Sequence, residues 1–128
     1  MLTRQEINER IEAYAKAVRN RDAKAVSELF ADKLDHIVHG IGSNPNTPWN
    51  TKQESDRAGI FAIYEEFFTS VDKIDVQYTD RCIDAESNSA AVVVRVKNTT
   101  TNMVNSLHIK WNDQGKIIFF YNWYGQGL

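Results

Sequence analysis

The chain has 128 residues, the size of one ordinary domain, and its composition is 42% hydrophobic and 25% charged. These values exclude a disordered chain, a collagen-like repeat and a disulfide scaffold. The 15 basic and 17 acidic residues leave a net charge of −2, and no basic block occurs, so we expect no nucleic-acid partner.

Three helical patterns occupy the first part of the chain. Thr3 and Glu6 have the spacing of a capping box, which marks a helix start. Asp22 is placed to cap a second, short helix that ends near Asp32, and a third helix is predicted over about residues 56–70. The apolar faces of the first and third helices are predicted to be Ile7, Ile11, Tyr14, Ala15 and Val18, and Ile60, Tyr64, Phe67 and Phe68.

The remaining segments predict strands and turns. Residues 34–39 suit a short strand, and residues 40–50 contain both prolines and predict a loop. After Ser70 the hydrophobic period changes from 3.6 to 2, which predicts four strands within residues 74–78, 90–96, 101–111 and 117–124. The segment Asn112–Gly115 between the last two is a hairpin turn. Helices followed by consecutive strands predict an α+β fold, in which helices cover one face of a curved antiparallel sheet.

The single cysteine, the short apolar runs and two arginines bear on the redox chemistry, the cellular location and the ligand of the protein. The single cysteine, Cys82, excludes an intrachain disulfide, and we expect it to be buried. The apolar runs are too short to span a bilayer, and the first residues lack the apolar core of a signal peptide. We therefore expect one domain over residues 1–128, a cytoplasmic location and no membrane partner. Arg57 and Arg95 could hold an acidic substrate group, but we expect both on the surface.

Three stretches of the chain carry recognisable motifs. The first joins Glu12-Ala-Tyr14 to Glu28-Leu-Phe-Ala-Asp32, the second joins Thr47-Pro-Trp49 to Arg57-Ala-Gly-Ile60 and Phe67-Phe68, and the third is the final hairpin from His108 to Ile118. In this order and spacing they resemble the nuclear transport factor 2-like superfamily, in particular its SnoaL-like and ketosteroid isomerase-like branch.

The resemblance implies a cystatin-like cone, a curved sheet closed by three N-terminal helices around an apolar pocket with one open mouth. Such a pocket takes a hydrophobic small molecule. The outer face of the sheet forms a homodimer interface in many members, so we expect a homodimer. The residues expected on this outer face are Arg95, Lys97, Ser106 and His108.

The resemblance also implies which residues do chemistry. Ketosteroid isomerase-like members abstract a proton with one carboxylate and hold the enolate with a tyrosine and a protonated acid. The tyrosine falls on Tyr14 and a supporting tyrosine on Tyr64, but the two acids fall on Val38 and Leu107. Because both carboxyl groups are missing, we do not expect steroid isomerisation by that mechanism.

Histidine remains for proton transfer. His36 is two residues from Val38, so it would share the face of Val38 and point into the pocket, whereas a one-residue bulge would give this position to His39. Both are candidates, because imidazole exchanges protons near neutral pH. At this spacing the two histidines face opposite sides of a strand, so no metal site is expected, and no glycine-rich phosphate loop occurs, so no cofactor is expected.

Further residues are expected to contact a ligand. Trp49 could cover the mouth or anchor its loop, and Tyr14 and Tyr64 could hold ligand oxygen or serve as core aromatics. Asn122 is a polar residue among aromatics, so it could bond a ligand or a neighbouring loop. The remaining expected wall residues are Val38, Leu107, Phe120 and Tyr124.

The combination of histidine, tyrosine and asparagine favours an enzyme. We expect a cofactor-independent isomerase, cyclase or dehydratase (a lyase) that acts on a hydrophobic carbonyl compound, such as a polyketide or terpenoid, by His/Tyr acid–base chemistry. A carrier that holds an apolar molecule without catalysis is the alternative, and a protein-interaction module is the third possibility. The sequence identifies neither the substrate nor the direction of the reaction.

Overall fold

A computed structural model describes residues 1–34, 36–40, 56–70, 73–97 and 102–124, of which 36–40, 102–103 and 122–124 are described by their backbone. The helices are α1 (Arg4–Arg19), α2 (Ala23–Glu28) and α3 (Arg57–Thr69), and the strands are β1 (His36–Gly40), β2 (Asp75–Asp84), β3 (Ser89–Lys97), β4 (Asn102–Trp111) and β5 (Ile117–Tyr124). This order confirms the predicted succession of elements.

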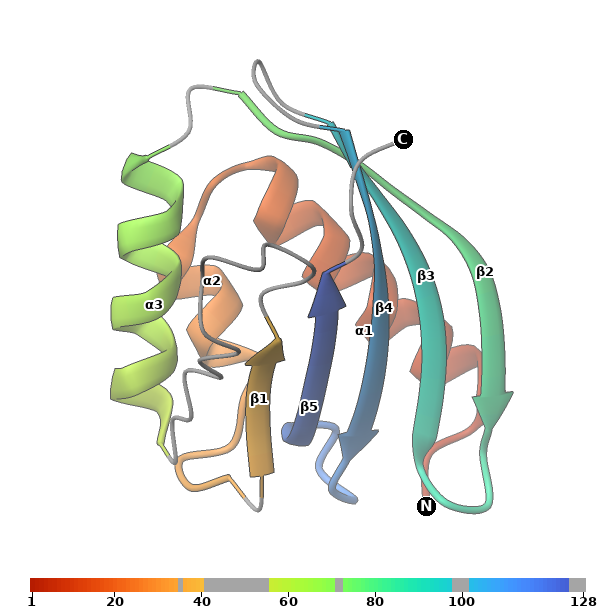
Figure 1. Cartoon of the computed structure of the whole chain (residues 1–128). Helices are drawn as coiled ribbons and strands as arrows, with labels where there is room; N and C mark the ends of the chain where they lie inside the picture. Colours follow the sequence, from red (N-terminus) through yellow and green to blue (C-terminus); the bar gives the residue numbers. More distant parts are fainter. Residues whose placement is uncertain (35, 41–55, 71–72, 98–101, 125–128) are drawn as a thin grey trace.

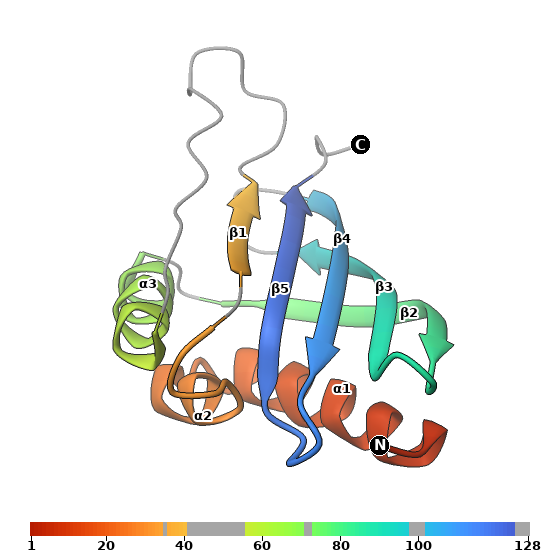
Figure 2. The same ribbon diagram turned by 90° about the horizontal axis from the view of Figure 1, so that it is seen from below.

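The strands form one curved sheet in the order β1-β5-β4-β3-β2. Strands β2 to β5 are antiparallel neighbours, and β1 pairs with β5 in parallel. The three helices lie on the same side of the sheet (Figures 1 and 2), where α1 packs against β2 and α2 packs against both α1 and α3. The sheet is not closed, because β1 and β2 are its two edges. The α+β prediction of a curved sheet covered by helices is confirmed.

The caps of the helices follow the sequence. Thr3 accepts from the backbone N–H of Glu6, and the Glu6 side chain accepts from the backbone N–H of Thr3, which is the predicted capping box. These hydrogen bonds, led by the one from the Thr3 backbone, lower the pKa of Glu6. Asp22 caps α2 and Asp56 caps α3.

Helix α2 ends earlier than predicted. Its C-cap is Leu29 rather than a residue near Asp32. The next residue, Phe30, forms a parallel bridge with Ile117 at the start of β5, and the Ile117 carbonyl accepts from Ala31 N–H at 2.9 Å. The backbone therefore leaves the helix to pair with the last strand, a long-range contact that the local pattern does not reveal.

The core lies between the helices and the concave face of the sheet, called the inner face below. The inner face carries alternate residues of each strand, as the period of 2 predicts. The expected outer-face residues Arg95, Lys97, Ser106 and His108 are exposed, which confirms the alternation. The most deeply buried large side chains are Ile7, Ile11, Val26, Phe30, Ile60, Val76, Val92, Ile109, Ile117 and Phe120.

A bulge in β2 changes which residues face the helices. Tyr78 pairs with Val94, but Arg81 pairs with Val92, so β2 has an extra residue between these pairs. After the bulge Arg81 reaches α1, where it contacts Asn8 and Glu12.

The same bulge corrects the expectation for Cys82. This residue lies opposite Ala91 on β3, and both are exposed. The prediction that Cys82 is buried is therefore wrong. Strand β2 is a sheet edge, and the bulge assigns Arg81 and Ile83 to the side of the helices, which leaves Cys82 on the outer face.

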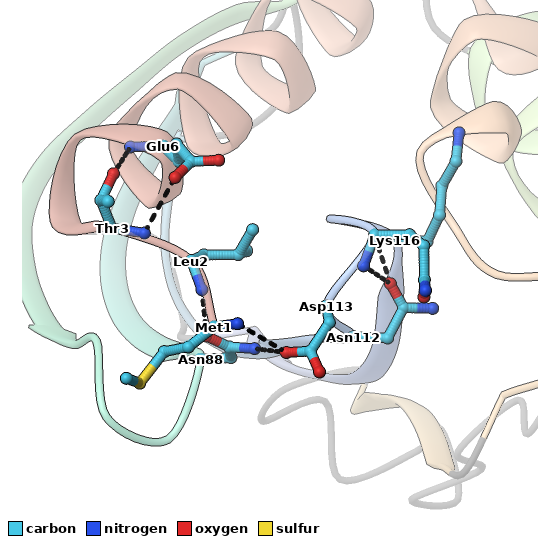
Figure 3. Close-up of polar contacts among 9 residues, drawn as sticks. Met1, Leu2, Thr3, Glu6, Asn88, Asn112, Asp113 and Lys116 are labelled. Carbon is cyan, nitrogen blue, oxygen red and sulfur yellow. Dashed lines mark hydrogen bonds and ion pairs between the residues drawn. The ribbon is translucent and has the colours of Figure 1, made fainter.

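One end of the sheet is tied to the N-terminus by polar contacts (Figure 3), and we call this region the hairpin end. The Leu2 N–H donates to Asn88 Oδ1 at 2.8 Å, the Asn88 amide donates to Asp113 at 3.1 Å, and the Met1 ammonium pairs with Asp113 at 3.0 Å. The hydrogen bond from this ammonium, followed by that from Asn88, lowers the pKa of Asp113. The hairpin end consists of Met1, Leu2, Asn88, Asn112, Asp113 and Lys116.

The turn before β5 is the predicted hairpin. The Asn112 side-chain oxygen accepts from the backbone N–H groups of Gln114 and Lys116 at 3.1 and 2.9 Å. Gly115 has φ +77°, and a Cβ at this position would lie 2.6 Å from the Arg10 guanidinium. The positive φ therefore favours glycine here, and a Cβ would also require the end of the Arg10 side chain to move.

Candidate functional site

Two tyrosines from different helices meet inside the core. Tyr14 lies on the apolar stripe of α1 and Tyr64 on that of α3, and only 4% and 5% of their surfaces are exposed. Their hydroxyl oxygens are 2.5 Å apart, and either hydroxyl can be the donor. The predicted pair is thus brought together by residues 50 positions apart in the sequence.

Aromatic rings surround this hydroxyl pair. The Tyr14 ring contacts Tyr78 of β2 and Phe120 of β5, with centroid distances of 5.9 and 5.5 Å. The Tyr64 ring lies 5.6 Å from that of Phe68, one turn further along α3. The surroundings are of low polarity, so a hydrogen bond formed here is stronger than the same bond in water.

The sheet contributes a set of residues in register. Leu107 of β4 lies opposite Asn122 of β5, and Asn122 lies opposite His39 of β1. Leu107 is 2% exposed, so its own side chain lies against the core. Phe120, predicted as a wall residue, is fully buried.

The other predicted site residues are placed by their backbone or lie outside the described residues. The backbone of His36 is opposite Phe119, and that of Val38 is opposite Tyr121. The backbone of Tyr124 is opposite Asn105. Trp49 lies outside the described residues.

Sequence reasoning overlooked Asn105 on β4. This residue is 4% exposed, and its Oδ1 atom has no hydrogen-bond partner among the described residues. The alternation of β4 does indicate that Asn105 is buried. Leu107, Ile109 and Trp111 are its inward residues, and the next inward position toward the N-terminus is residue 105. A polar residue in that series is the exception that the pattern could have revealed.

Arg57 is held by the fold. Its Nε and Nη2 atoms donate to the Phe30 carbonyl oxygen at 3.1 and 2.8 Å, and Nη1 pairs with Asp32 at 2.9 Å. The guanidinium thus fixes the chain after α2 to the start of α3, while Arg95 is exposed.

Other site types find no support in the described part of the chain. Within it, no group of three or more His, Cys, Asp or Glu side chains could hold a metal ion. No helix among the same residues is long and apolar enough to cross a bilayer.

Solved structures with the same fold include proteins of several activities. SalBIII, an epoxide hydrolase/cyclase-like enzyme in pyran ring formation of the polyether salinomycin, is 16% identical, with 98% of this chain and 95% of that chain covered and a TM-score of 0.74. A protein of unknown function with a cystatin-like fold from Methylobium petroleophilum is 17% identical. The alignment covers 96% of this chain and 78% of that chain, with a TM-score of 0.75. A steroid delta-isomerase from Pseudomonas aeruginosa is 14% identical. The alignment covers 93% of this chain and 79% of that chain, with a TM-score of 0.66.

Sequence comparison identifies the family. No curated protein matches the chain, but the family model of the SnoaL-like domain matches residues 7–114. This match covers most of the chain, and it agrees with the curved sheet, the helix order and the similar structures. The protein therefore belongs to the SnoaL-like domain family of the nuclear transport factor 2-like superfamily.

Proposed function

We propose that this protein is a cofactor-independent isomerase, cyclase or dehydratase that acts on a hydrophobic carbonyl compound such as a polyketide or terpenoid. The observation that carries the proposal is the buried hydroxyl pair of Tyr14 and Tyr64, with 2.5 Å between the oxygens. The activities named for SalBIII and for the Pseudomonas isomerase, ring formation and steroid isomerisation, support the same class of chemistry.

The tyrosine pair suits the stabilisation of an enolate. When one phenol donates to a second, the O–H of the second is polarised and becomes a stronger donor. The helices hold both rings before any substrate binds, so no reorganisation is needed when the carbonyl oxygen gains negative charge. The pair therefore stabilises the enolate-like transition state more than the neutral ketone.

We assign the proton transfer to His39, with His36 as the other candidate. The backbone of His39 shares a row with Asn122 and the buried Leu107, whereas that of His36 shares a row with Phe119, which is partly exposed. Paired residues of neighbouring strands belong to the same face of a sheet, and this supports His39. Imidazole titrates near neutral pH, so it can accept a proton and return it.

The reaction balances without a further reagent. The imidazole takes a proton from the carbon next to the carbonyl, and the C–H electron pair moves into the enolate. Return of the proton at a conjugated carbon gives isomerisation. Attack of the enolate carbon on a second carbonyl closes a ring, and the imidazolium returns its proton to the alkoxide oxygen that this attack forms. Loss of a β-hydroxyl group, protonated by the imidazolium, gives dehydration and releases water.

Exchange of ketone protons with D2O tests this proposal. The wild type, Tyr14→Phe, His36→Ala and His39→Ala are incubated with 2-decalone, and NMR measures deuterium incorporation next to the carbonyl. We expect the wild type to accelerate exchange, Tyr14→Phe to be about 100-fold slower, and His39→Ala to lose more activity than His36→Ala. Exchange that is equally fast in the wild type and in Tyr14→Phe would contradict the tyrosine role.

A carrier function is the second candidate. It is favoured by Leu107, a buried apolar residue at one of the positions where the ketosteroid isomerase-like pattern has an acid. An apolar wall is enough to hold a ligand, whereas catalysis needs a titratable group. Thermal stabilisation of the wild type by a ketone, without any proton exchange, would support the carrier over the enzyme.

A further inference from the structure

The amide of Asn105 differs from the other buried polar side chains. Ser27 and Ser89 are also buried, but Ser27 Oγ donates to the Lys24 carbonyl at 2.8 Å, and Ser89 Oγ lies 2.6 Å from Ser87 Oγ. Asn105 is 4% exposed, and its Oδ1 has no hydrogen-bond partner among the described residues.

An amide oxygen in this state destabilises the folded protein. A buried acceptor has given up its hydrogen bonds to water, and the loss is not recovered without a donor in the protein. Native proteins contain few such groups, and each calls for an explanation. The neighbouring inward residues Leu107 and Ile109 are apolar and buried, so an apolar residue at position 105 would fit the pattern without this penalty.

The position of Asn105 relates it to the tyrosine pair. Asn105 pairs with Val94 of β3, and Val94 pairs with Tyr78 of β2, whose ring contacts that of Tyr14 at 5.9 Å. Two strand spacings separate Asn105 from Tyr78, about 10 Å along the same row of the inner face. Strand pairing thus connects Asn105, through Val94 and Tyr78, to the ring of Tyr14 on the side of the sheet that faces the helices.

We propose that Asn105 is a ligand-binding residue whose Oδ1 accepts a hydrogen bond from a hydroxyl group of a ligand, while Tyr14 and Tyr64 hold the carbonyl oxygen of the same ligand. The inference rests on the proposed function and narrows its substrate class to hydrophobic hydroxy ketones. A ligand hydroxyl supplies the donor that the oxygen lacks, and the carbonyl group supplies the acceptor for the phenols.

The first arm of the test needs no ligand. We expect Asn105→Leu to raise the melting temperature of the free protein by a few degrees, on the order of 3–5 °C. The matched control is Ser89→Ala, which removes a buried hydroxyl whose Oγ lies 2.6 Å from Ser87 Oγ, and it should not raise the melting temperature. Destabilisation or failure to fold of Asn105→Leu would show that the amide is already bonded, for example to an internal water, and would overturn the proposal.

The second arm measures binding of two matched series of probes, ω-hydroxyalkyl phenyl ketones and n-alkyl phenyl ketones of equal chain length. In the wild type, the best hydroxy ketone should bind about 5- to 10-fold more tightly than its matched alkyl ketone. Asn105→Leu should remove or reverse this preference. Asn105→Asp keeps an acceptor oxygen at this position and should retain it.

The outcomes separate the two proposals. Equal binding of both series by the wild type, or a preference that persists in Asn105→Leu, would overturn the role of Asn105 and leave the proposed ketone chemistry in place. If neither series bound the wild type, the proposed function would fail, and the ligand role of Asn105 would fail with it. If Asn105 binds the ligand, Asn105→Leu should lose the preference for hydroxy ketones and have a raised melting temperature, while the wild type and Asn105→Asp keep the preference.

Discussion

The hairpin end and the inner face both bring polar groups together from distant parts of the chain, but they do so in different surroundings. At the hairpin end the Asp113 carboxylate is exposed, and it pairs with Met1 and Asn88 beside water. Between the helices and the inner face, Tyr14 and Tyr64 meet among apolar side chains. Water can replace a lost partner at the exposed carboxylate, whereas the two tyrosines are buried.

This difference shows where substitutions should matter. A polar contact beside water contributes little net free energy, because each group bonds solvent equally well when the contact is lost. A polar contact in the core leaves an unsatisfied group when one partner is removed. The helical face of the sheet should therefore be both the functional and the more sensitive part of the molecule.

The largest effect is expected at the tyrosine pair. Tyr14→Phe and Tyr64→Phe should each lower the free energy of unfolding by about 1–3 kcal/mol, because each removes one partner of a buried hydrogen bond. The double variant should lose less than the sum of the two, since no hydroxyl is left without this partner. Urea unfolding of the three variants checks this. Strictly additive losses would mean that the two hydroxyls do not depend on one another.

Arg57 makes a contact that is intermediate between an exposed and a buried one. Its guanidinium is partly exposed, but it donates to the carbonyl oxygen of the buried residue Phe30. Arg57→Ala should lower the free energy of unfolding by about 1–2 kcal/mol, because the Phe30 carbonyl loses both of its bonds from this side chain. Arg95→Ala, on the exposed outer face, is the matched control and should change it by less than about 0.5 kcal/mol. Equal effects of the two substitutions, measured by urea unfolding, would remove the structural role of Arg57.

Gly115, in the turn between Asn112 and Lys116 of the hairpin end, tests whether a change there affects stability without affecting ligand binding. Gly115→Ala should lower the free energy of unfolding by about 1 kcal/mol, because its φ of +77° disfavours a Cβ and the Arg10 guanidinium must move. Gly115→Asn should lose less, since asparagine tolerates this conformation better. Ketone binding by both folded variants should equal that of the wild type. Weakened binding would mean that the hairpin end and the inner face are coupled.

The smallest effect concerns pH. Hydrogen bonds at the N-terminus lower the pKa of both Asp113 and Glu6 in the folded protein. A carboxyl group with a lowered folded pKa contributes stability above its unfolded pKa, and the contribution is lost as the pH falls through the folded pKa. Asp113→Asn should therefore weaken the decline in melting temperature below about pH 4. The change should be slight because the group is exposed, and an unchanged acid profile would show that the contact with Met1 contributes nothing.

Local signals predicted most of the fold. The capping box of Thr3 and Glu6, the cap at Asp22 and the turn ending at Gly115 depend on residues within a few positions of one another, so the sequence contains all the information needed. The succession of helices and strands follows from the same kind of local period.

Features that depend on distant contacts were missed or predicted less well. The bulge that exposes Cys82 arises where β2 crosses α1, and no local residue pattern marks it. The early end of α2 results from pairing with β5. For the site, the positions of Tyr14 and Tyr64 were predictable from the resemblance. The proposal for Asn105 depends on its burial and on an Oδ1 atom without a hydrogen-bond partner in the described part of the chain, which the sequence does not show.

The parallel pairing of β1 with β5 has a consequence for how the protein is made. His36 pairs with Phe119, 83 residues later in the chain, so the strand that carries both histidines cannot dock until the last strand has left the ribosome. Until then only β2, β3 and β4 are available to the helices, so part of the apolar stripes of α1 and α3 stays uncovered. Such long-range pairing is typical of slow-folding topologies, and a nascent chain that ends before residue 117 should expose these stripes to chaperones.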